Sequence, residues 1–151
     1  MDDLPVLLEF EQGVIAAERP FDSTLKADPI QYYDLPFMIN ADHVELVVAE
    51  TAGIVAGSGY VRIETSRIYH KHAQHGYLGF MYVRPEYRGR GINNMIMHVL
   101  RQWALSKNIQ ELRLEVYAGN QPAIQAYTKT GFIHYMVQMR LGLDDEQSNK
   151  L

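Results

Sequence analysis

The sequence predicts one mixed α/β domain over residues 1–143, in which a largely antiparallel sheet is flanked by helices. Two runs rich in β-branched residues, 44–49 and 53–63, are joined by a short turn and predict an antiparallel hairpin. The run 77–83 is apolar on both faces, as expected of a strand that is covered on both sides. An amphipathic helix pattern over 92–103 follows it directly. These three observations carry the fold class.

The N-terminal third is predicted to hold one helix and an irregular segment. Asp3 is placed to cap the helix, and Pro5 fits its first turn. The pair Arg19-Pro20 ends the helix, because proline cannot continue it. Residues 21–41 carry two further prolines among aromatic side chains, which predicts a short helix within loops.

Helices and strands alternate in the second half of the chain. Strands are predicted at 112–117 and 133–141, and between them a short helix begins near Pro122 and ends before Gly131. The tail 144–151 is polar and is expected to fray. The helix over 92–103 is predicted to bury one apolar stripe, formed by Ile92, Met95, Ile96, Val99, Leu100 and Trp103.

The composition excludes several classes of protein. The 151 residues include 47% apolar side chains, which is enough for a hydrophobic core. The 18 acidic residues outnumber the 14 basic ones, whereas general nucleic-acid binders carry a basic excess. No cysteine is present, so a disulfide, a thiolate zinc site and a cysteine nucleophile are excluded. The acidic start and the lack of an apolar run of ~18 residues predict a cytoplasmic protein that does not span or bind a membrane.

The segment RGRGIN, residues 88–93, lies where the apolar strand gives way to the helix. The first N–H groups of a helix have no partner inside it and lie at the positive end of its dipole. Gly89 and Gly91 let a ligand approach this backbone, and Arg88 and Arg90 add positive charge. The segment therefore predicts a pyrophosphate site, although its spacing differs from G-x-G-x-x-G and from G-x-x-x-x-G-K-[ST]. A flexible turn without a ligand is the alternative that the turn alone leaves open.

A second motif lies downstream of this turn and consists of Asn120, Ala123, Tyr127, Gly131 and Phe132. Together with VRPEYRGRGI, it resembles the GNAT superfamily of acetyl-CoA-dependent N-acetyltransferases. The glycine-rich pattern of that family, [Q/R]-x-x-G-x-[G/A], is matched by Arg88 and Gly91, whereas Asn93 stands in place of a small residue. The resemblance covers residues 44–141 well and the N-terminal third loosely.

The resemblance implies a twisted, mostly antiparallel sheet whose strands 80–83 and 114–117 splay apart to admit acetyl-CoA as co-substrate. The amides of residues 88–93 would hold the pyrophosphate, Asn120 would bond to the pantetheine arm, and Tyr127 would face the thioester sulfur. The full set of coenzyme-binding residues that it implies is Met81, Tyr82, Val83, Arg88, Gly89, Arg90, Gly91, Ile92, Asn93, Asn120, Ala123, Tyr127 and Lys129.

Acetyl transfer to an amine needs a proton donor, which the chemistry of Tyr127 suits. The sulfur leaves as a thiolate whose conjugate acid resembles a thiol of pKa ~8.5, and a tyrosine of pKa ~10 is still protonated at pH 7. The alternative is that Tyr127 is only an amphipathic residue of a helix that faces the core. The motif around it favours the role of general acid.

The reaction also needs a base, because an alkyl amine of pKa ~10.4 is almost entirely protonated at pH 7. Related enzymes often place a glutamate on the strand before the glycine-rich turn, but the strand 77–83 holds no acid. The candidates are Glu115 and His75, together with Glu64 at the end of the hairpin. A relay through water and backbone carbonyls would need none of them.

The predicted acceptor is a primary amine of a small molecule or a peptide, which attacks directly in a ternary complex. Tyrosines and acidic side chains in 21–41 favour a cationic amine with an apolar body. An inactive acyl-CoA-binding sensor is the alternative function, and RNA binding is disfavoured by the net charge of −4. A sheet edge left unpaired would permit a homodimer.

Three histidines invite a metal hypothesis, namely His70, His72 and His75. No cysteine and no acid accompany them in the segment IYHKHAQHGY. A solvated loop is therefore the favoured interpretation, and no metal is expected.

Overall fold

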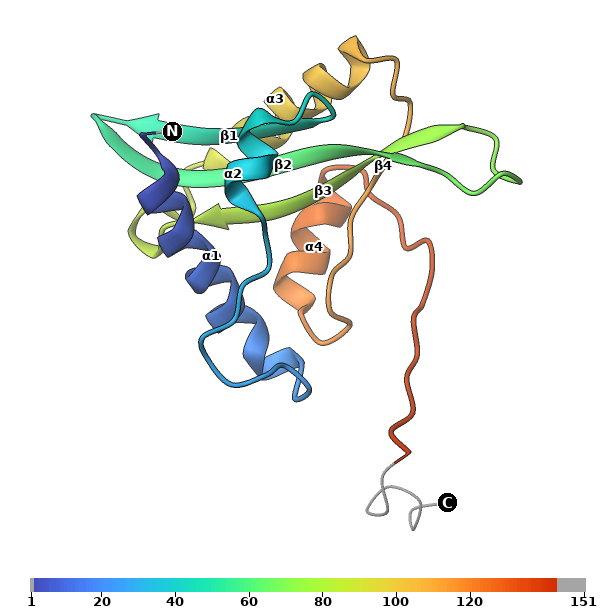
Figure 1. Cartoon of the computed structure of the whole chain (residues 1–151), viewed down its shortest axis with the longest axis horizontal. Coiled ribbons are helices and arrows are strands. Elements are labelled where there is room, and N and C mark those ends of the chain that lie inside the picture. The colour runs from blue at the N-terminus through green and yellow to red at the C-terminus, as the bar shows by residue number, and fades with distance from the viewer. Residues whose placement is uncertain (1, 144–151) are drawn as a thin grey trace. The chain divides into compact units, whose positions relative to one another are not determined.

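The computed structural model describes residues 2–143 (Figure 1), and these form two compact units that divide after Gly119. The second unit holds α4 (Gln121–Lys129). The first holds α1 (Leu4–Glu18), η1 (Arg19–Phe21), α2 (Leu35–Asn40), β1 (Val44–Thr51), β2 (Ile54–Thr65), β3 (Gln74–Val83), η2 (Pro85–Tyr87), α3 (Ile92–Ser106) and β4 (Leu112–Arg113). The predicted single domain stays a prediction, and the tail 144–151 lies outside the described residues.

The sheet of the first unit has the strand order β1-β2-β3-β4. Strand β2 pairs antiparallel with β1 and with β3, so the predicted hairpin is confirmed and continues into a third strand. Strand β4 pairs parallel with β3. The mixed, largely antiparallel sheet that the sequence predicts is therefore present.

Helices cover both faces of this sheet (Figure 1). On one face, α3 lies so close to β2 that a Cβ added to Gly59 would be 2.7 Å from a methyl carbon of Ile96. On the other face, α1 and α2 form a buried cluster with the strands, made of Leu7, Phe10, Leu35, Met38, Val44, Tyr60 and Phe80. Apolar side chains on alternate strand positions thus serve two separate layers.

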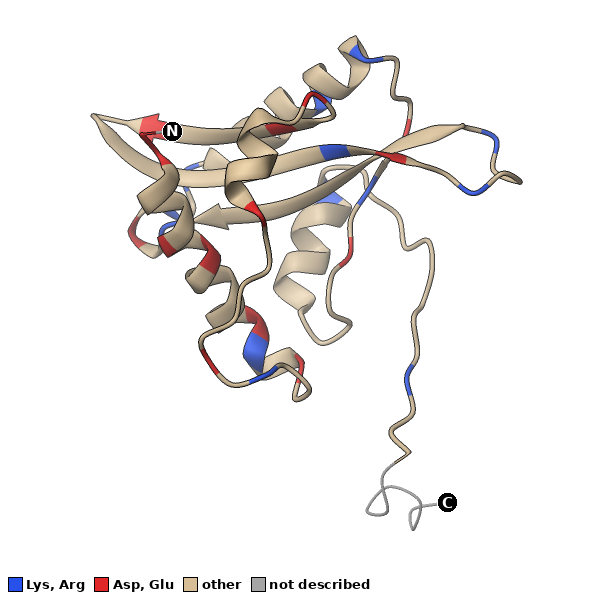
Figure 2. Cartoon of the chain, in the orientation of Figure 1, with Lys and Arg blue, Asp and Glu red and all other residues tan. Residues whose placement is uncertain are grey.

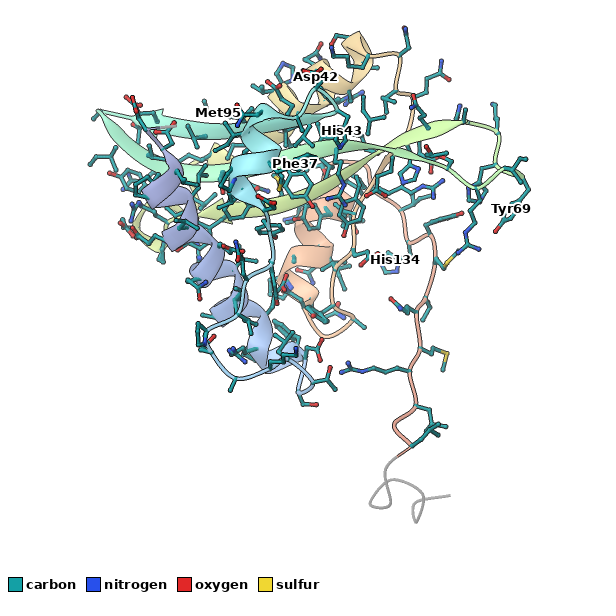
Figure 3. The ribbon with its side chains drawn as sticks, in the orientation of Figure 1. Phe37, Asp42, His43, Tyr69, Met95 and His134 are labelled. Atoms are coloured by element: carbon teal, nitrogen blue, oxygen red, sulfur yellow. The ribbon has the colours of Figure 1, made fainter. Side chains whose placement is uncertain are left out.

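The face of α3 that packs on the sheet differs from the predicted stripe. Ile96 and Leu100 are buried as expected, but Met95 and Val99 are 64% and 48% exposed. Met95 is labelled in Figure 3. Met97 and Ala104 are buried in their place. The contact line runs through positions 96, 97, 100 and 104, so the prediction was rotated by part of a turn about the helix axis.

Two predicted strands are shorter or absent. Strand β4 covers only Leu112–Arg113 of the predicted 112–117. Residues 133–141 form no strand, although their apolar side chains alternate with polar ones. A strand needs hydrogen bonds to a neighbour, and the described part of residues 120–151 contains one helix and no strand.

The N-terminal elements follow the prediction except at one cap. Helix α1 ends at Glu18, where η1 begins. Asp3 makes no side-chain cap, and its carbonyl oxygen instead accepts from the N–H of Leu7 at 3.0 Å. Helix α2 is capped by Asp34, whose Oδ1 accepts from the N–H of Phe37 at 3.1 Å.

Arg84 ties the end of β3 to its surroundings. Its Nε donates to the carbonyl oxygen of Val55 at 2.9 Å, and its Nη1 donates to Glu9 Oε1 at 2.9 Å. Its guanidinium carbon lies 5.0 Å from the centre of the Phe10 ring. One side chain therefore joins β3, β2 and α1 just before residues 88–93.

Candidate functional site

The glycine turn, residues 88–93, has a left-handed backbone at both glycines. Gly89 has φ 77° and Gly91 has φ 78°, a region that favours glycine because it has no Cβ. A Cβ added at either position would meet no atom within 4 Å, so the space outside the turn is open. The glycines therefore serve the backbone conformation and leave the turn accessible to a ligand.

The start of α3 presents unpaired backbone donors to this space. The helix begins at Ile92, and its first hydrogen bond runs from the N–H of Met95 to the carbonyl oxygen of Gly91 at 3.1 Å. The preceding N–H groups, of Ile92, Asn93 and Asn94, have no partner inside the helix. Gly91 is the N-cap and supplies no side-chain cap. Amides and dipole together favour an anion here.

Both arginines of the turn are exposed and are oriented by contacts with neighbouring tyrosines. Arg88 donates from Nε to the carbonyl oxygen of Val83 at 3.0 Å, and its guanidinium lies 6.0 Å from the centre of the Tyr82 ring. The guanidinium of Arg90 lies 5.2 Å from the centre of the Tyr87 ring. Two positive charges therefore accompany the turn amides, as a pyrophosphate site requires.

Strands β3 and β4 separate immediately after they meet. They share two register pairs, Gly76 with Leu112 and Tyr77 with Arg113. No pairing joins residues 78–83 to 114–117 within the described part of the chain. The backbone of Met81 to Val83, which was predicted to face the coenzyme, lies on the diverging part of β3.

A second polar group of side chains lies on the sheet face that α1 and α2 share. We call it the tyrosine–arginine face, and it consists of Tyr60, Arg62, Glu64, His75, Tyr77 and Glu115. Tyr60, Arg62 and Glu64 alternate along β2, so they project to the same side. Arg62 pairs with Tyr77, and Glu64 pairs with His75, across β2 and β3.

Arg62 lies between two aromatic rings of this face. Its guanidinium carbon is 5.6 Å from the centre of the Tyr60 ring and 5.4 Å from that of Tyr77. Its Nε donates to Glu64 Oε1 at 2.9 Å. Sequence reasoning did not single out Tyr60, Arg62 or Tyr77, although charges inside an otherwise apolar strand were a usable signal.

The tyrosines of this region are kept protonated. Burial raises the pKa of Tyr60 and Tyr77, and the negative charge of Glu115 raises both pKa values further. Burial also raises the pKa of Tyr33, whose ring lies 5.8 Å from that of Tyr60. Glu11 positions Tyr33, because its Oε1 accepts from that residue's N–H at 2.9 Å. These hydroxyl groups remain hydrogen-bond donors at neutral pH.

His75 is a buried strand residue and not part of a solvated loop. It is 6% exposed, its Nδ1 is 2.8 Å from Ser66 Oγ, and its Nε2 is 3.5 Å from Glu64 Oε2. Burial, and next the charge of Arg113, lower the pKa of His75. A neutral ring with its proton on Nε2 satisfies both neighbours. With both nitrogens engaged, the geometry favours a positioning role over that of a base.

Glu115, the other base candidate, is exposed and lies past the end of β4. Its charge acts on Tyr60 and Tyr77, which places the carboxylate near the tyrosine–arginine face. Among residues 2–143, Glu115 forms no ion pair. A carboxylate without a cationic partner is available to an incoming ammonium group.

The second unit contains the remaining predicted residues. Asn120 caps α4, because its Oδ1 accepts from the N–H of Ala123 at 3.4 Å. Tyr127 is half-buried and packs edge-on against Phe132, with ring centres 5.9 Å apart. Lys129 is exposed in the last turn, and Gly131 follows with φ 104°. The motif therefore builds a capped helix with a glycine stop.

No group of three or more His, Cys, Asp or Glu side chains within residues 2–143 is arranged to hold a metal ion. His70 lies 3.3 Å from Arg113 Nη2 through its Nδ1, and His75 is engaged as described above. None of the helices in the described range is both long and apolar enough to cross a membrane.

Comparison with known proteins identifies the family. The model of the acetyltransferase (GNAT) family matches residues 13–132. The chain belongs to the GNAT acetyltransferase family. A solved GNAT-fold structure, that of a predicted acetyltransferase from Clostridium acetobutylicum with acetyl-CoA, superposes with a TM-score of 0.69 at 19% identity, covering 94% of this chain and 91% of that one. This likeness confirms the fold.

Two relatives share parts of the sequence. The thialysine N-epsilon-acetyltransferase of Bos taurus is 42% identical over 55 residues, which are 36% of this chain and 32% of that protein. Acetyltransferase SG1711 of Sodalis glossinidius is 34% identical over 99 residues, which are 64% of this chain and 62% of that protein. The matches thus span about a third and about three-fifths of these relatives.

Proposed function

We propose that this GNAT protein transfers an acetyl group from acetyl-CoA to a primary amine of a small molecule or a peptide. The observation that carries the proposal is the glycine turn. Two left-handed glycines and the open start of α3 offer amide donors, and two exposed arginines add charge. A pyrophosphate matches this combination, and the Clostridium acetobutylicum relative was crystallised with acetyl-CoA.

The divergence of strands β3 and β4 supports a binding site for the rest of the coenzyme along β3. Backbone groups of Met81, Tyr82 and Val83 lie where β3 has left β4, so they are available to an extended arm. We propose that the pantetheine arm runs along these residues. Ile92 and Asn93 in the first turn of α3 belong to the same proposed contacts. For Asn120, Ala123 and Lys129, the proposed contact with the coenzyme rests on the resemblance of their motif to the family.

The transfer proceeds in a ternary complex, because the chain has no cysteine to carry the acetyl group. The amine nitrogen attacks the thioester carbonyl, a C–N bond forms, and the C–S bond then breaks. Tyr127 donates a proton to the departing thiolate. A tyrosine hydroxyl suits this step, because its ordinary pKa of ~10 leaves it protonated at pH 7.

Glu115 accepts the proton of the amine in this proposal. About one alkyl amine in 2,500 is neutral at pH 7, which corresponds to about 4.6 kcal/mol for a pKa of ~10.4. An unpaired carboxylate attracts the ammonium group and takes its proton directly or through water. The acidic side chains on α1, which Figure 2 shows, add a negative field to the first unit.

The experiment begins with calorimetric titration of acetyl-CoA, with adenosine and pantetheine as controls. Tight one-site binding that requires the pyrophosphate supports the glycine turn. A turnover assay over a panel of amines follows, with Tyr127→Phe as the variant. We expect Tyr127→Phe to keep acetyl-CoA affinity and to lose about 100-fold in kcat. If the protein binds acetyl-CoA but acetylates none of the amines, the proposed acetyltransferase activity is contradicted and the alternative function, an acyl-CoA sensor, is supported.

A further inference from the structure

Arg62 is held in a fixed orientation on the tyrosine–arginine face. The rings of Tyr60 and Tyr77 lie 5.6 and 5.4 Å from its guanidinium carbon, and Glu64 accepts its Nε–H at 2.9 Å. Glu64 in turn faces His75, whose other nitrogen is bonded to Ser66. A chain of buried and half-buried contacts therefore sets the direction of this guanidinium.

The guanidinium retains donors for a ligand. Arginine has five N–H donors in a planar fork, which matches a carboxylate with two parallel hydrogen bonds. Glu64 Oε1 accepts from Nε and Nη2, and the Tyr60 oxygen also accepts from the guanidinium, so these three bonds leave two of the five N–H groups. The side chain is 35% exposed, so its remaining donors are accessible from water.

The position of Arg62 is next to the point where the strands part. Arg62 pairs with Tyr77, and Tyr77 forms the last register pair between β3 and β4, with Arg113. The charge of Glu115 acts on the same tyrosine. Tyr77 thus has Arg62 as its neighbour on β2 and Arg113 as its neighbour on β4, and the carboxylate of Glu115 lies close enough to raise its pKa.

We propose that Arg62 determines acceptor specificity by binding a carboxylate of the acceptor. This inference rests on the proposed function and narrows it to amino carboxylates. The acceptor's amine lies toward Glu115 and its carboxylate lies toward Arg62, while Glu64 and His75 are positioning residues for the guanidinium. A purely cationic acceptor cannot accept the remaining hydrogen bonds of Arg62, so it forgoes this interaction.

The test uses matched acceptors that differ in one group. A series of ω-amino carboxylates of increasing chain length is compared with the corresponding ω-amino amides, with acetyl-CoA saturating. We expect at least one length for which the carboxylate has a kcat/KM about 10- to 100-fold higher than its amide, the range expected of hydrogen bonds to a charged group.

Variants of Arg62 test whether this residue causes the preference for carboxylates. Arg62→Gln should reduce the ratio of carboxylate to amide to near one, and Arg62→Lys should keep part of it, since it retains the charge but loses the fork. Arg67→Gln is the matched control, because Arg67 lies on the exposed loop after β2 and its loss changes the net charge equally. The control should leave the ratio unchanged.

Each outcome decides a separate point. Equal kcat/KM for carboxylates and amides at every length overturns the inference, as does a preference that survives in Arg62→Gln. Both leave acetyl transfer intact. No turnover of any acceptor overturns the proposed function and the inference with it. Acetyl-CoA affinity is measured for each variant to check folding, and the wild-type comparison decides if Arg62→Gln fails to fold.

Discussion

The glycine turn and the tyrosine–arginine face are built in opposite ways. The turn is a continuous segment in which backbone amides and two left-handed glycines form the proposed coenzyme site. The face gathers side chains from β2, β3 and the segment after β4, and its shape depends on strand register. A site made of backbone is tied to one ligand chemistry, whereas a site made of side chains can change specificity without changing the fold. In this chain the first suits the shared co-substrate and the second the acceptor.

The largest effect that separates the two regions is expected at Glu115. Glu115→Gln removes the proposed base and should lower kcat about 100-fold, which equals about 2.7 kcal/mol in the barrier, with the acetyl-CoA affinity unchanged. Steady-state kinetics and calorimetry measure the two quantities. Glu50→Gln at the exposed end of β1 is the control and should retain wild-type kcat. An unchanged kcat in Glu115→Gln would show that Glu115 is not the general base.

The next largest effect is expected for Gly91→Ala, which should weaken acetyl-CoA binding at the glycine turn. The added Cβ points into the open space beside the turn, and the left-handed backbone adds about 1–2 kcal/mol of strain. We expect acetyl-CoA affinity to fall at least tenfold by calorimetry, about 1.4 kcal/mol.

Gly53→Ala provides a matched control for that strain. Gly53 has the same φ of 78° and the same open surroundings, but it lies in the turn between β1 and β2. It should lose similar stability in urea unfolding and keep full acetyl-CoA affinity. Equal loss of affinity in both variants contradicts a binding role for the glycine turn.

Gly79→Ala tests the tyrosine–arginine face by disturbing the packing of Tyr60. A Cβ at this position would be 2.5 Å from the Tyr60 hydroxyl oxygen, so the ring must move. We expect a loss of about 1–3 kcal/mol in the free energy of unfolding and a raised KM for the acceptor, with unchanged acetyl-CoA affinity. Gly119→Ala, whose Cβ would be 3.2 Å from the Phe21 ring, is the milder comparison. A raised KM for acetyl-CoA contradicts the separation of the two regions.

The smallest expected effect concerns His75. Its pKa is lowered in the folded chain, so below about 6.5 the unfolded chain binds a proton that the folded chain does not. Wild-type stability therefore falls as pH falls from about 6.5 toward the lowered pKa. His75→Asn lacks this contribution, so its loss of stability relative to the wild type should become smaller between pH 8 and pH 5. His98→Asn, on the exposed side of α3, is the comparison variant.

The contrast also explains what the sequence could predict. The glycine turn and the motif from Asn120 to Phe132 are local, so their spacing alone indicates an anion site and a capped helix. Arg62 and Tyr77 become neighbours only through the register of β2 and β3, which a single sequence does not specify. Long-range pairing likewise decides how far β4 extends.

Surface loops were predicted less well for the same reason. His75 looked like part of a histidine-rich loop, but β3 begins at Gln74 and carries it into a buried position. Tyr69 lies at the exposed outer end of the β2–β3 hairpin (Figure 3). Where a hairpin bends depends on pairing with the neighbouring strand, because residues 66–74 offer no proline or glycine to mark the turn.

Arg84 has a mechanical consequence for coenzyme recognition. Its hydrogen bonds to Val55 of β2 and Glu9 of α1 anchor the chain at the end of β3, just before the glycine turn. The beginning of α3 is held by Ile96 and Leu100 in the core. The turn between these two anchors already has a defined backbone, so the proposed coenzyme binding should cost little conformational entropy. The glycine turn therefore connects two segments that are both anchored by side-chain contacts.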